Sequence, residues 1–246
     1  MPSFLLINLN NTSTKLALAD EEMLIDRRVV PTKSVSLSSI KRALKRWQFD
    51  RVLLGSVVPK KTVVFRRLFG NQMKEVSPKL NLGIGISYPD PSKIGADRLA
   101  NSVAVTARYG SPAVVVDFGT AVTFDIVSEK GSYQGGVIGP GLAAMTEYLH
   151  QRTALLPRIR LEELVEPPSP IGKTTRLAMI AGAVHGYRGL VRQILSEVVR
   201  ELNGKVHIVA TGSYADLIAA KLPELQIVDP DLTLEGLRII ALRNPL

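Results

Sequence analysis

Short apolar runs alternate with longer segments of helical periodicity along the whole chain. The runs that predict strands are Phe4–Asn8, Lys15–Ala19, Arg51–Ser56, Ala113–Asp117, Val122–Val127, Val206–Ala210 and Gln226–Val228. The segments whose apolar residues recur at helical spacing are Ile40–Trp47, Lys61–Phe69, Ile94–Tyr109, Thr174–Leu202, Tyr214–Lys221 and Leu234–Leu242. Strands that alternate with helices predict an α/β fold.

Two of these strand pairs repeat one strand–turn–strand pattern, at residues 5–15 and 114–124. The second copy has Asp117 at the strand end and Gly119 in the turn, where the first has Asn8 and Asn10. An acid beside a glycine suits a site for a cation and phosphates, because glycine lets the backbone approach a ligand closely. An ordinary hairpin turn uses the same residue types, so the pattern alone leaves both interpretations open.

The repeat lies on either side of the turn residues Gly110-Ser111-Pro112. This favours two similar lobes over one continuous sheet, and it predicts an N-terminal lobe of residues 1–112 and a C-terminal lobe of residues 113–246. A phosphate-binding device that occurs twice further predicts a nucleotide in a cleft between the two lobes.

The longest helical segment, Thr174–Leu202, is interrupted by Gly182, Gly186 and Gly189. A glycine inside a helix costs about 1 kcal/mol relative to alanine. Three of them therefore predict that another backbone approaches this helix closely, either from the same lobe or from a second subunit.

Composition and charge argue against a nucleic-acid-binding, membrane or secreted protein. The net charge of +9 is spread along the chain, and the densest basic cluster, in residues 41–51, alternates with apolar residues as on a solvated helix. We therefore expect no nucleic-acid partner. No apolar run approaches the roughly 18 residues of a membrane span, and the start lacks a secretory pattern. Together with the absence of cysteine, this predicts a cytoplasmic protein without a membrane partner.

The segment Gly95-Ala96-Asp97-Arg98 opens a predicted helix. An acid and a guanidinium beside the free backbone donors of a first turn can orient an anionic or hydroxyl-bearing substrate. The alternative is an acid that only complements the helix dipole, next to a surface arginine. A glycine run at residues 135–141 predicts a backbone wall around a ligand before a helix.

Two other candidate motifs fail on their spacing. Gly172-Lys173-Thr174-Thr175 imitates the end of a P-loop, but Pro167 stands where that motif needs a glycine. The three histidines have no spacing typical of metal ligands.

Taken together, these segments resemble the type III pantothenate kinases, a family of the acetate and sugar kinase, chaperone and actin superfamily. The family pattern contains DxGNTxxK, YxxPxxxGADR, DxGTAxTxD, GGxIxPG, GxxT, TGG and DxxLxLxGL, in that order. The corresponding segments here are 8–15, Tyr88 to Arg98, Asp117 to Asp125, Gly135 to Gly141, Gly172 to Thr175, Thr211-Gly212 and Asp229 to Leu237. The match extends over nearly the whole length.

The resemblance implies an actin-like or ribonuclease H-like α/β fold of two lobes, each a mixed sheet flanked by helices. It implies ATP-dependent phosphorylation of pantothenate to 4′-phosphopantothenate, the first step of coenzyme A biosynthesis, by a homodimer that uses Mg²⁺ and K⁺ or NH₄⁺. Asp97 would be the general base and Asp117 the ligand of the monovalent cation. The residues that would hold pantothenate are Tyr88, Gly95, Ala96, Arg98 and Thr175, and those that would contact ATP are Asn8, Asn10, Asn11, Thr12, Lys15 and Thr120.

The chain departs from the family pattern in three places. Asn8 replaces an aspartate that helps to place the magnesium–phosphate complex, Asn10 replaces the turn glycine, and Ser213 replaces the second glycine of TGG. Asparagine tolerates left-handed backbone better than most residues, but an amide brings no negative charge to a metal. We therefore expect reduced activity. The alternative is a weakened or inactive homologue that acts as a pantothenate- or nucleotide-binding regulatory dimer.

Overall fold

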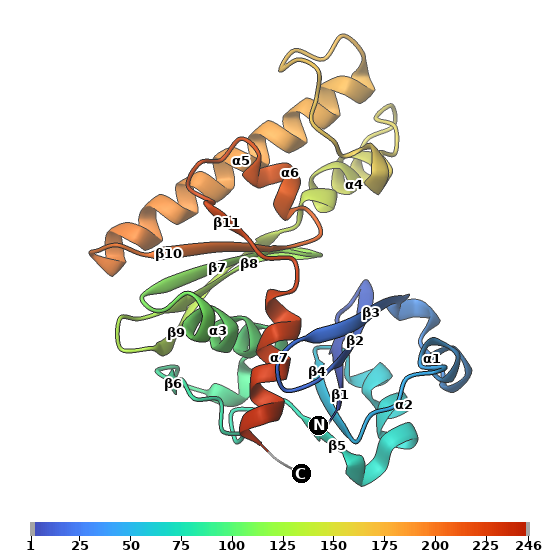
Figure 1. Ribbon diagram of the computed structural model, residues 1–246. Helices are drawn as coiled ribbons and strands as arrows, with labels where there is room; N and C mark the ends of the chain where they lie inside the picture. The colour runs from blue at the N-terminus through green and yellow to red at the C-terminus, as the bar shows by residue number, and fades with distance from the viewer. Residues whose placement is uncertain (1–2, 245–246) are drawn as a thin grey trace. The chain divides into compact units, whose positions relative to one another are not determined.

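The computed structural model describes residues 3–244, which form two compact units (Figure 1). Unit 1 comprises residues 3–111, 129–134 and 231–244, and unit 2 comprises residues 112–128 and 135–230. Each unit contains a mixed sheet with flanking helices, which confirms the predicted fold class. The cleft that the sequence predicts for a nucleotide involves both units and stays a prediction.

The sheet of unit 1 has five strands in the order β3-β2-β1-β4-β5. Their bounds are β1 Phe4–Leu9, β2 Ser13–Ala19, β3 Leu24–Pro31, β4 Arg51–Ser56 and β5 Met73–Glu75. The pairs β1-β2 and β2-β3 are antiparallel, whereas β1-β4 and β4-β5 are parallel. Strand β1 is buried at all six positions because helices cover both faces of the sheet.

Four helices flank this sheet. Helices α1 (Leu37–Ala43) and α2 (Pro59–Phe69) pack on one face, and α3 (Ala96–Arg108) and α7 (Leu232–Arg243) pack on the other. Helices α3 and α7 approach backbone to backbone, since a Cβ built on Gly236 would lie 2.0 Å from the carbonyl oxygen of Ala100. The buried Thr233 hydroxyl donates a hydrogen bond to Asn101 Oδ1 at 2.7 Å, which fixes the register of the two helices.

In unit 2 the strands follow the order β11-β10-β7-β8-β9. Their bounds are β7 Ala113–Phe118, β8 Ala121–Val127, β9 Ser132–Pro140, β10 His207–Gly212 and β11 Ile227–Val228. The short strand β6 (Gly85–Ile86) pairs with the first residues of β9, which belong to unit 1. The helices are α4 (Leu142–Arg152), α5 (Thr175–Leu202) and α6 (Ala215–Ala219). Val184, Tyr187 and Val191 of α5 form the core with Val114 and Val116 of β7.

Short 3-10 helices complete the described chain, at Thr32–Ser34, Gly70–Gln72, Pro91–Lys93 and Leu161–Glu163. No helix within residues 3–244 is both long and apolar enough to cross a membrane.

Every predicted strand and helix is present within a few residues of its predicted ends. The sequence analysis missed four strands, β3, β5, β6 and β9. Strand β3 is an edge strand whose middle residues are mostly exposed, so it lacks an apolar run. The glycine run predicted to form a wall before a helix instead belongs largely to β9, and α4 follows it.

The unit boundary between Ser111 and Pro112 lies next to the predicted lobe boundary. The sequence analysis predicted that residues 113–246 form one lobe. In the structure the last helix, α7, belongs to unit 1 instead. Its physical reason is the contact with α3: Leu234, Leu237 and Ile240 enter the core of unit 1.

We expect Gly236→Ala to lower the free energy of unfolding by about 1–3 kcal/mol, because the added methyl group would force α7 away from α3. The measurement is equilibrium unfolding in urea. Gly204→Ala is the control, since a Cβ there meets nothing closer than 4.0 Å, and we expect a change within about 0.5 kcal/mol. Equal stability of the two variants would show that the α3–α7 contact is not tight.

Candidate functional site

In unit 1 the candidate residues gather where strands β1 and β4 end. Asn8 pairs with Lys15 of β2 on one side and with Gly55 of β4 on the other. A Cβ on Gly55 would lie 3.1 Å from Leu237 and 3.7 Å from Ala96, so this position faces α7 and α3. Directly paired residues share one face of a sheet. Asn8 and Lys15 therefore point to the same side as the start of α3.

The first turn of α3 brings Asp97 close to the ends of β1 and β4. Gly95, the residue before the helix, would place a Cβ 2.6 Å from Asp97 Oδ1 and 3.5 Å from Val57, the second residue after Gly55. A side chain at position 95 would require the Asp97 carboxylate to shift from this position. Asp97 Oδ1 accepts a hydrogen bond from the backbone N–H of Arg98 at 2.9 Å.

Burial raises the pKa of the Asp97 carboxyl above its ordinary value of 3.8, because desolvation disfavours the charged form. The backbone hydrogen bond from Arg98 and the guanidinium of Arg98 both lower this pKa, but by less than burial raises it. A carboxylate with a raised pKa holds a proton more readily, which suits a general base.

The turn after β1 is closed by backbone and threonine hydrogen bonds. The N–H of Asn10 donates to Ser13 O at 3.2 Å, and the Thr32 hydroxyl donates to Asn10 O at 2.6 Å. The side-chain oxygen of Asn10 is buried and has no hydrogen-bond partner among residues 3–244. Asn11 and Thr12 are exposed at the tip of the turn.

The turn at Asn10 does not use left-handed backbone. Within residues 3–244 the only non-glycine residues with positive φ are Arg46 and Asn203, and Gly119 in the second copy is not left-handed either. The replacement of glycine by Asn10 therefore costs no backbone strain.

Arg98, the residue after Asp97, lies beside aromatic side chains. The guanidinium carbon of Arg98 lies 5.6 Å from the ring centroid of Tyr133, and the ring of Tyr88 lies 6.0 Å from the same ring. Tyr88 is 36% exposed, Arg98 is half-buried and Tyr133 is buried. Sequence reasoning predicted Tyr88 and Arg98 as site residues and missed Tyr133, because strand β9 was not predicted.

In unit 2, Asp117 occupies the corresponding position near the end of β7. It pairs with Thr123 of β8 and Thr211 of β10. Gly212, with a φ of +94°, would place a Cβ 2.6 Å from Asp117 Oδ1, so only glycine allows β10 to end against this carboxylate.

Gly141 closes the turn that holds Thr120. Its N–H donates to Thr120 O at 3.2 Å, and a Cβ there would lie only 2.3 Å from the same oxygen. The structure thus brings the turn at Thr120 and the end of the glycine run together.

Thr175, the first residue of α5, is exposed at one end of a groove between α4 and α5. The groove has a volume of about 400 Å³ and is otherwise lined by Met145, Leu149, Leu156, Ala178, Met179, Gly182 and Ala183. Along α5, Gly182, Gly186 and Gly189 face open space, with no other described residue within 4 Å of a Cβ built on them. Within residues 3–244 no backbone makes the close approach that these glycines predict.

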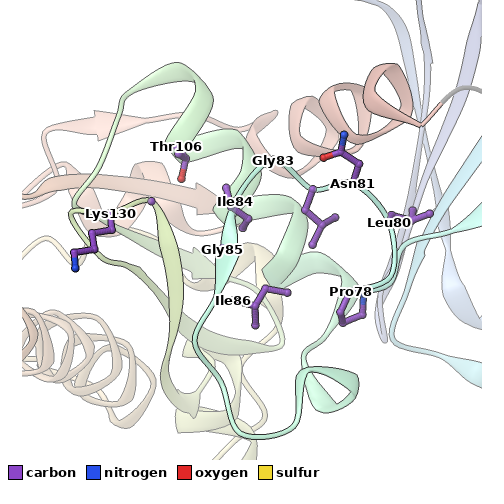
Figure 2. Close-up of a pocket in the computed structure, with 11 residues that line it drawn as sticks. Pro78, Leu80, Asn81, Gly83, Ile84, Gly85, Ile86, Thr106 and Lys130 are labelled. Carbon is purple, nitrogen blue, oxygen red and sulfur yellow. The ribbon is translucent and has the colours of Figure 1, made fainter.

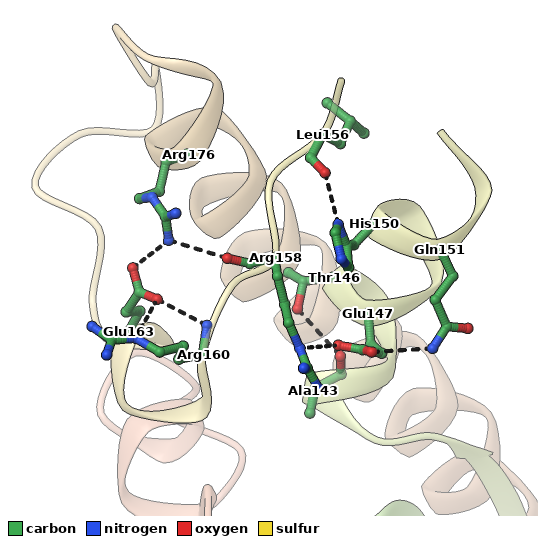
Figure 3. Close-up of polar contacts among 10 residues, drawn as sticks. All are labelled: Ala143, Thr146, Glu147, His150, Gln151, Leu156, Arg158, Arg160, Glu163 and Arg176. Carbon is green, nitrogen blue, oxygen red and sulfur yellow. Dashed lines mark hydrogen bonds and ion pairs between the residues drawn. The ribbon is translucent and has the colours of Figure 1, made fainter. Parts of the chain in front are cut away.

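The segment before Thr175 is held by ion pairs (Figure 3). Glu163 accepts hydrogen bonds from the backbone N–H of Arg160 and from the guanidinium of Arg176, and Glu147 pairs with Arg158 at 3.3 Å. The buried Arg188 grips Glu166 with two nitrogens and, with Lys221, lowers the pKa of that carboxyl to about 2. These contacts fix the path of the chain into α5.

A further pocket, of about 380 Å³, lies in unit 1 beside β6 (Figure 2). Its lining comes from Pro78, residues 80–86, Thr106 and the turn at Lys130 and Gly131. None of the predicted site residues lines it.

Residues 3–244 contain no group of three or more histidine or acidic side chains that could hold a metal by themselves. The oxygen atoms present fit a metal ion whose other ligands are phosphate oxygens or waters. In unit 1 the side-chain oxygen of Asn10, buried without a partner, can accept a hydrogen bond from a metal-bound water. In unit 2 the Asp117 carboxylate lies in the space that Gly212 leaves, which suits a hard cation.

Comparison with known proteins identifies relatives. The family model described as Type III pantothenate kinase matches residues 4–197. A Type III pantothenate kinase of Akkermansia muciniphila is 47% identical, covering 97% of this chain and 98% of its own length. That of Methylacidiphilum infernorum is 43% identical, covering 96% and 87%. A solved structure from Campylobacter jejuni, described as a Baf family transcriptional activator, shares the fold with a TM-score of 0.63 at 20% identity, covering 98% of both chains.

We expect Asp97→Asn to increase the free energy of unfolding at pH 7. A folded-state pKa raised above the unfolded value means that Asp97 opposes folding wherever it is ionised, and that this effect disappears as the pH falls through the raised pKa toward 3.8. The gain should therefore shrink toward pH 4. Urea unfolding of both proteins at several pH values measures it, and a gain that is the same at pH 4 and pH 7 would contradict the raised pKa.

Proposed function

The chain belongs to the type III pantothenate kinase family, and from this premise we propose that its own residues transfer the terminal phosphoryl group of ATP to the primary hydroxyl of pantothenate. The observation that carries the proposal is the half-buried carboxylate of Asp97 at the same sheet edge as Asn8 and Lys15. The proposed base and the proposed phosphate-binding hairpin therefore belong to one unit. We expect the enzyme to work in the cytoplasm.

Asp97 is the general base of the proposed reaction. As the hydroxyl oxygen of pantothenate bonds to the γ-phosphorus, the bond from phosphorus to the oxygen of ADP breaks, and the hydroxyl proton passes to the Asp97 carboxylate. Proton transfer of this kind contributes about 10²–10⁴-fold to a rate. Support comes from the raised pKa of Asp97, which keeps its proton affinity high enough for the task.

Arg98 and Tyr88 hold pantothenate in the proposed complex. The guanidinium suits the pantothenate carboxylate, because planar paired donors match a carboxylate in geometry and charge. Tyr88 offers an exposed ring edge and a hydroxyl for the rest of the molecule. Gly95 and Ala96 supply the free N-terminal backbone of α3, and Thr175 of α5 offers a further hydroxyl.

The hairpin of unit 1 binds the ATP phosphates. Lys15 supplies positive charge, and the exposed turn at Asn11 and Thr12 supplies backbone and hydroxyl donors. Asn8 and Asn10 would hold Mg²⁺ through their amide oxygens or its bound waters. When bound with ATP, magnesium neutralises charge on the phosphates. Because both side chains are neutral, they hold the metal less firmly than a carboxylate would.

The hairpin of unit 2 serves a monovalent cation and ATP. Asp117 is the proposed ligand of K⁺ or NH₄⁺, and Thr120 contacts ATP. Support comes from the close packing of Gly212 on Asp117 and of Gly141 on the Thr120 turn, which holds both groups rigidly.

The protein works as a homodimer through α5 and its neighbour α4. Two observations support this assembly. The exposed glycines of α5 leave space for another backbone, and the adjoining groove is apolar over most of its lining. An apolar groove of this kind gains free energy when a partner covers it. Thr175 lies at the end of the same groove.

We expect the wild-type protein to produce 4′-phosphopantothenate from pantothenate and ATP with Mg²⁺ and K⁺ or NH₄⁺, as measured by mass spectrometry. Asn8→Asp should raise turnover about tenfold, because a charged acceptor forms hydrogen bonds roughly twice as strong as those of a neutral one. Asp97→Asn should lower turnover by about 10²–10⁴.

Asp216→Asn, an exposed carboxylate on α6, is the control and should not change turnover. No product from folded wild-type protein at saturating ATP with each cation would overturn the proposed function. Equal turnover of the wild type and Asn8→Asp would show that Asn8 does not limit the metal site.

The dimer predicts a measured mass of twice the 26.8 kDa of one chain in sedimentation experiments. Gly182→Arg should yield a folded monomer, since the side chain extends into open space within one chain but would block a partner. Gly204→Arg, two residues beyond the C-terminal end of α5, should remain dimeric. A wild type that sediments as a monomer, or a dimer unaffected by Gly182→Arg, would contradict this assembly.

A further inference from the structure

Tyr133 of strand β9 is a buried aromatic residue with a fixed backbone. Its ring is fully buried in the core of unit 1, together with Leu99 and Val103 of α3. In the sheet Tyr133 pairs with Ile86 of β6, and the Tyr133 carbonyl accepts a hydrogen bond from Ser87 N at 2.8 Å. The strand that leads to Tyr88 is therefore tied to the strand that carries Tyr133.

This ring contacts two residues that the proposed function assigns to pantothenate. The Arg98 guanidinium carbon lies 5.6 Å from the ring centroid, which is within the range of a cation–π interaction. The Tyr88 ring lies 6.0 Å away at an interplanar angle of 52°, a tilted contact of the kind that aromatic pairs favour. Arg98 and Tyr88 come from different elements, and Tyr133 touches both.

We propose that Tyr133 is a positioning residue for the acceptor substrate: its buried ring holds the Arg98 guanidinium and the Tyr88 ring in the arrangement that binds pantothenate. The inference rests on the proposed function. A long arginine side chain loses rotamer entropy when it binds a carboxylate, and a contact that restrains it beforehand reduces that loss. Tyr133 therefore acts on pantothenate affinity and leaves ATP affinity unchanged.

The role belongs to the ring and not to the hydroxyl. A phenylalanine keeps the π face that the guanidinium contacts, whereas a leucine keeps apolar bulk without a π face. Tyr133→Phe should therefore bind pantothenate as the wild type does. Tyr133→Leu should bind it about tenfold more weakly, which corresponds to the loss of a partly desolvated cation–π contact.

The experiment measures three quantities in the full-length protein for Tyr133→Leu, Tyr133→Phe and Phe65→Leu. They are the Kd of pantothenate by calorimetry, the KM values of pantothenate and ATP, and the chemical shift of the Arg98 Nε proton. Phe65 is a fully buried ring of the other core of unit 1, so its loss controls for a general loss of stability. An aromatic face shifts a proton above it upfield, so the Arg98 signal reports the contact without any substrate.

Support requires that Tyr133→Leu raises the Kd and KM of pantothenate about tenfold with the KM of ATP unchanged, while both controls resemble the wild type. The Arg98 Nε proton should move downfield in Tyr133→Leu alone. An unchanged Arg98 signal, or equal effects of Tyr133→Leu and Phe65→Leu, would overturn the positioning role. A wild type that neither binds nor phosphorylates pantothenate overturns the proposed function instead, and the Arg98 signal still decides whether Tyr133 restrains Arg98.

Discussion

The contact between α7 and α3 is the constraint on which the rest of unit 1 depends. Gly236 lets the backbone of α7 lie directly against the carbonyl of Ala100, and the Thr233–Asn101 hydrogen bond fixes their relative register. Both helices then cover the face of β1 and β4 that bears Asn8 and Gly55. The start of α3, with Asp97 and Arg98, reaches the end of the sheet because its body is held in this way. A residue near the C-terminus thus determines the position of a proposed catalytic group.

The two hairpins are both antiparallel strand pairs joined by a short turn, but the first has Asn8 where the second has Asp117. Neither turn needs left-handed backbone at its middle position, since neither Asn10 nor Gly119 has positive φ. In unit 2 the close approach is made from outside the turn, where Gly141 packs on Thr120 and Gly212 packs on Asp117. In unit 1 the strand beside Asn8 carries Gly55, which leaves room for the Leu237 side chain of α7. Asparagine at position 8, where the family pattern has aspartate, therefore removes a negative charge from the first hairpin without requiring left-handed backbone in the turn.

The sequence predicted the central elements of both units because their signals are local. The strands around Asn8 and Asp117 are continuous apolar runs, and the helix that starts at Ala96 has a clear apolar face. Membership of α7 in unit 1 could not be predicted, since it follows from a contact between residues more than 130 positions apart in the chain. Strand β9 was missed because its glycines conceal the alternation, and with it Tyr133.

Arg98, the proposed substrate-binding arginine, affects the pKa of Asp97, the proposed base. Burial of Asp97 raises its pKa, and Arg98 lowers the same pKa through its backbone N–H and its charge. If Arg98 were free to move into solvent, its charge would oppose the effect of burial less, and Asp97 would hold its proton more tightly. The ring of Tyr133, by restraining the guanidinium, thus bears on the charge state of the base as well as on the substrate. In the proposed complex, a carboxylate bound to Arg98 would further neutralise its charge, so arrival of the acceptor would raise the proton affinity of Asp97 at the moment when a proton must be taken up.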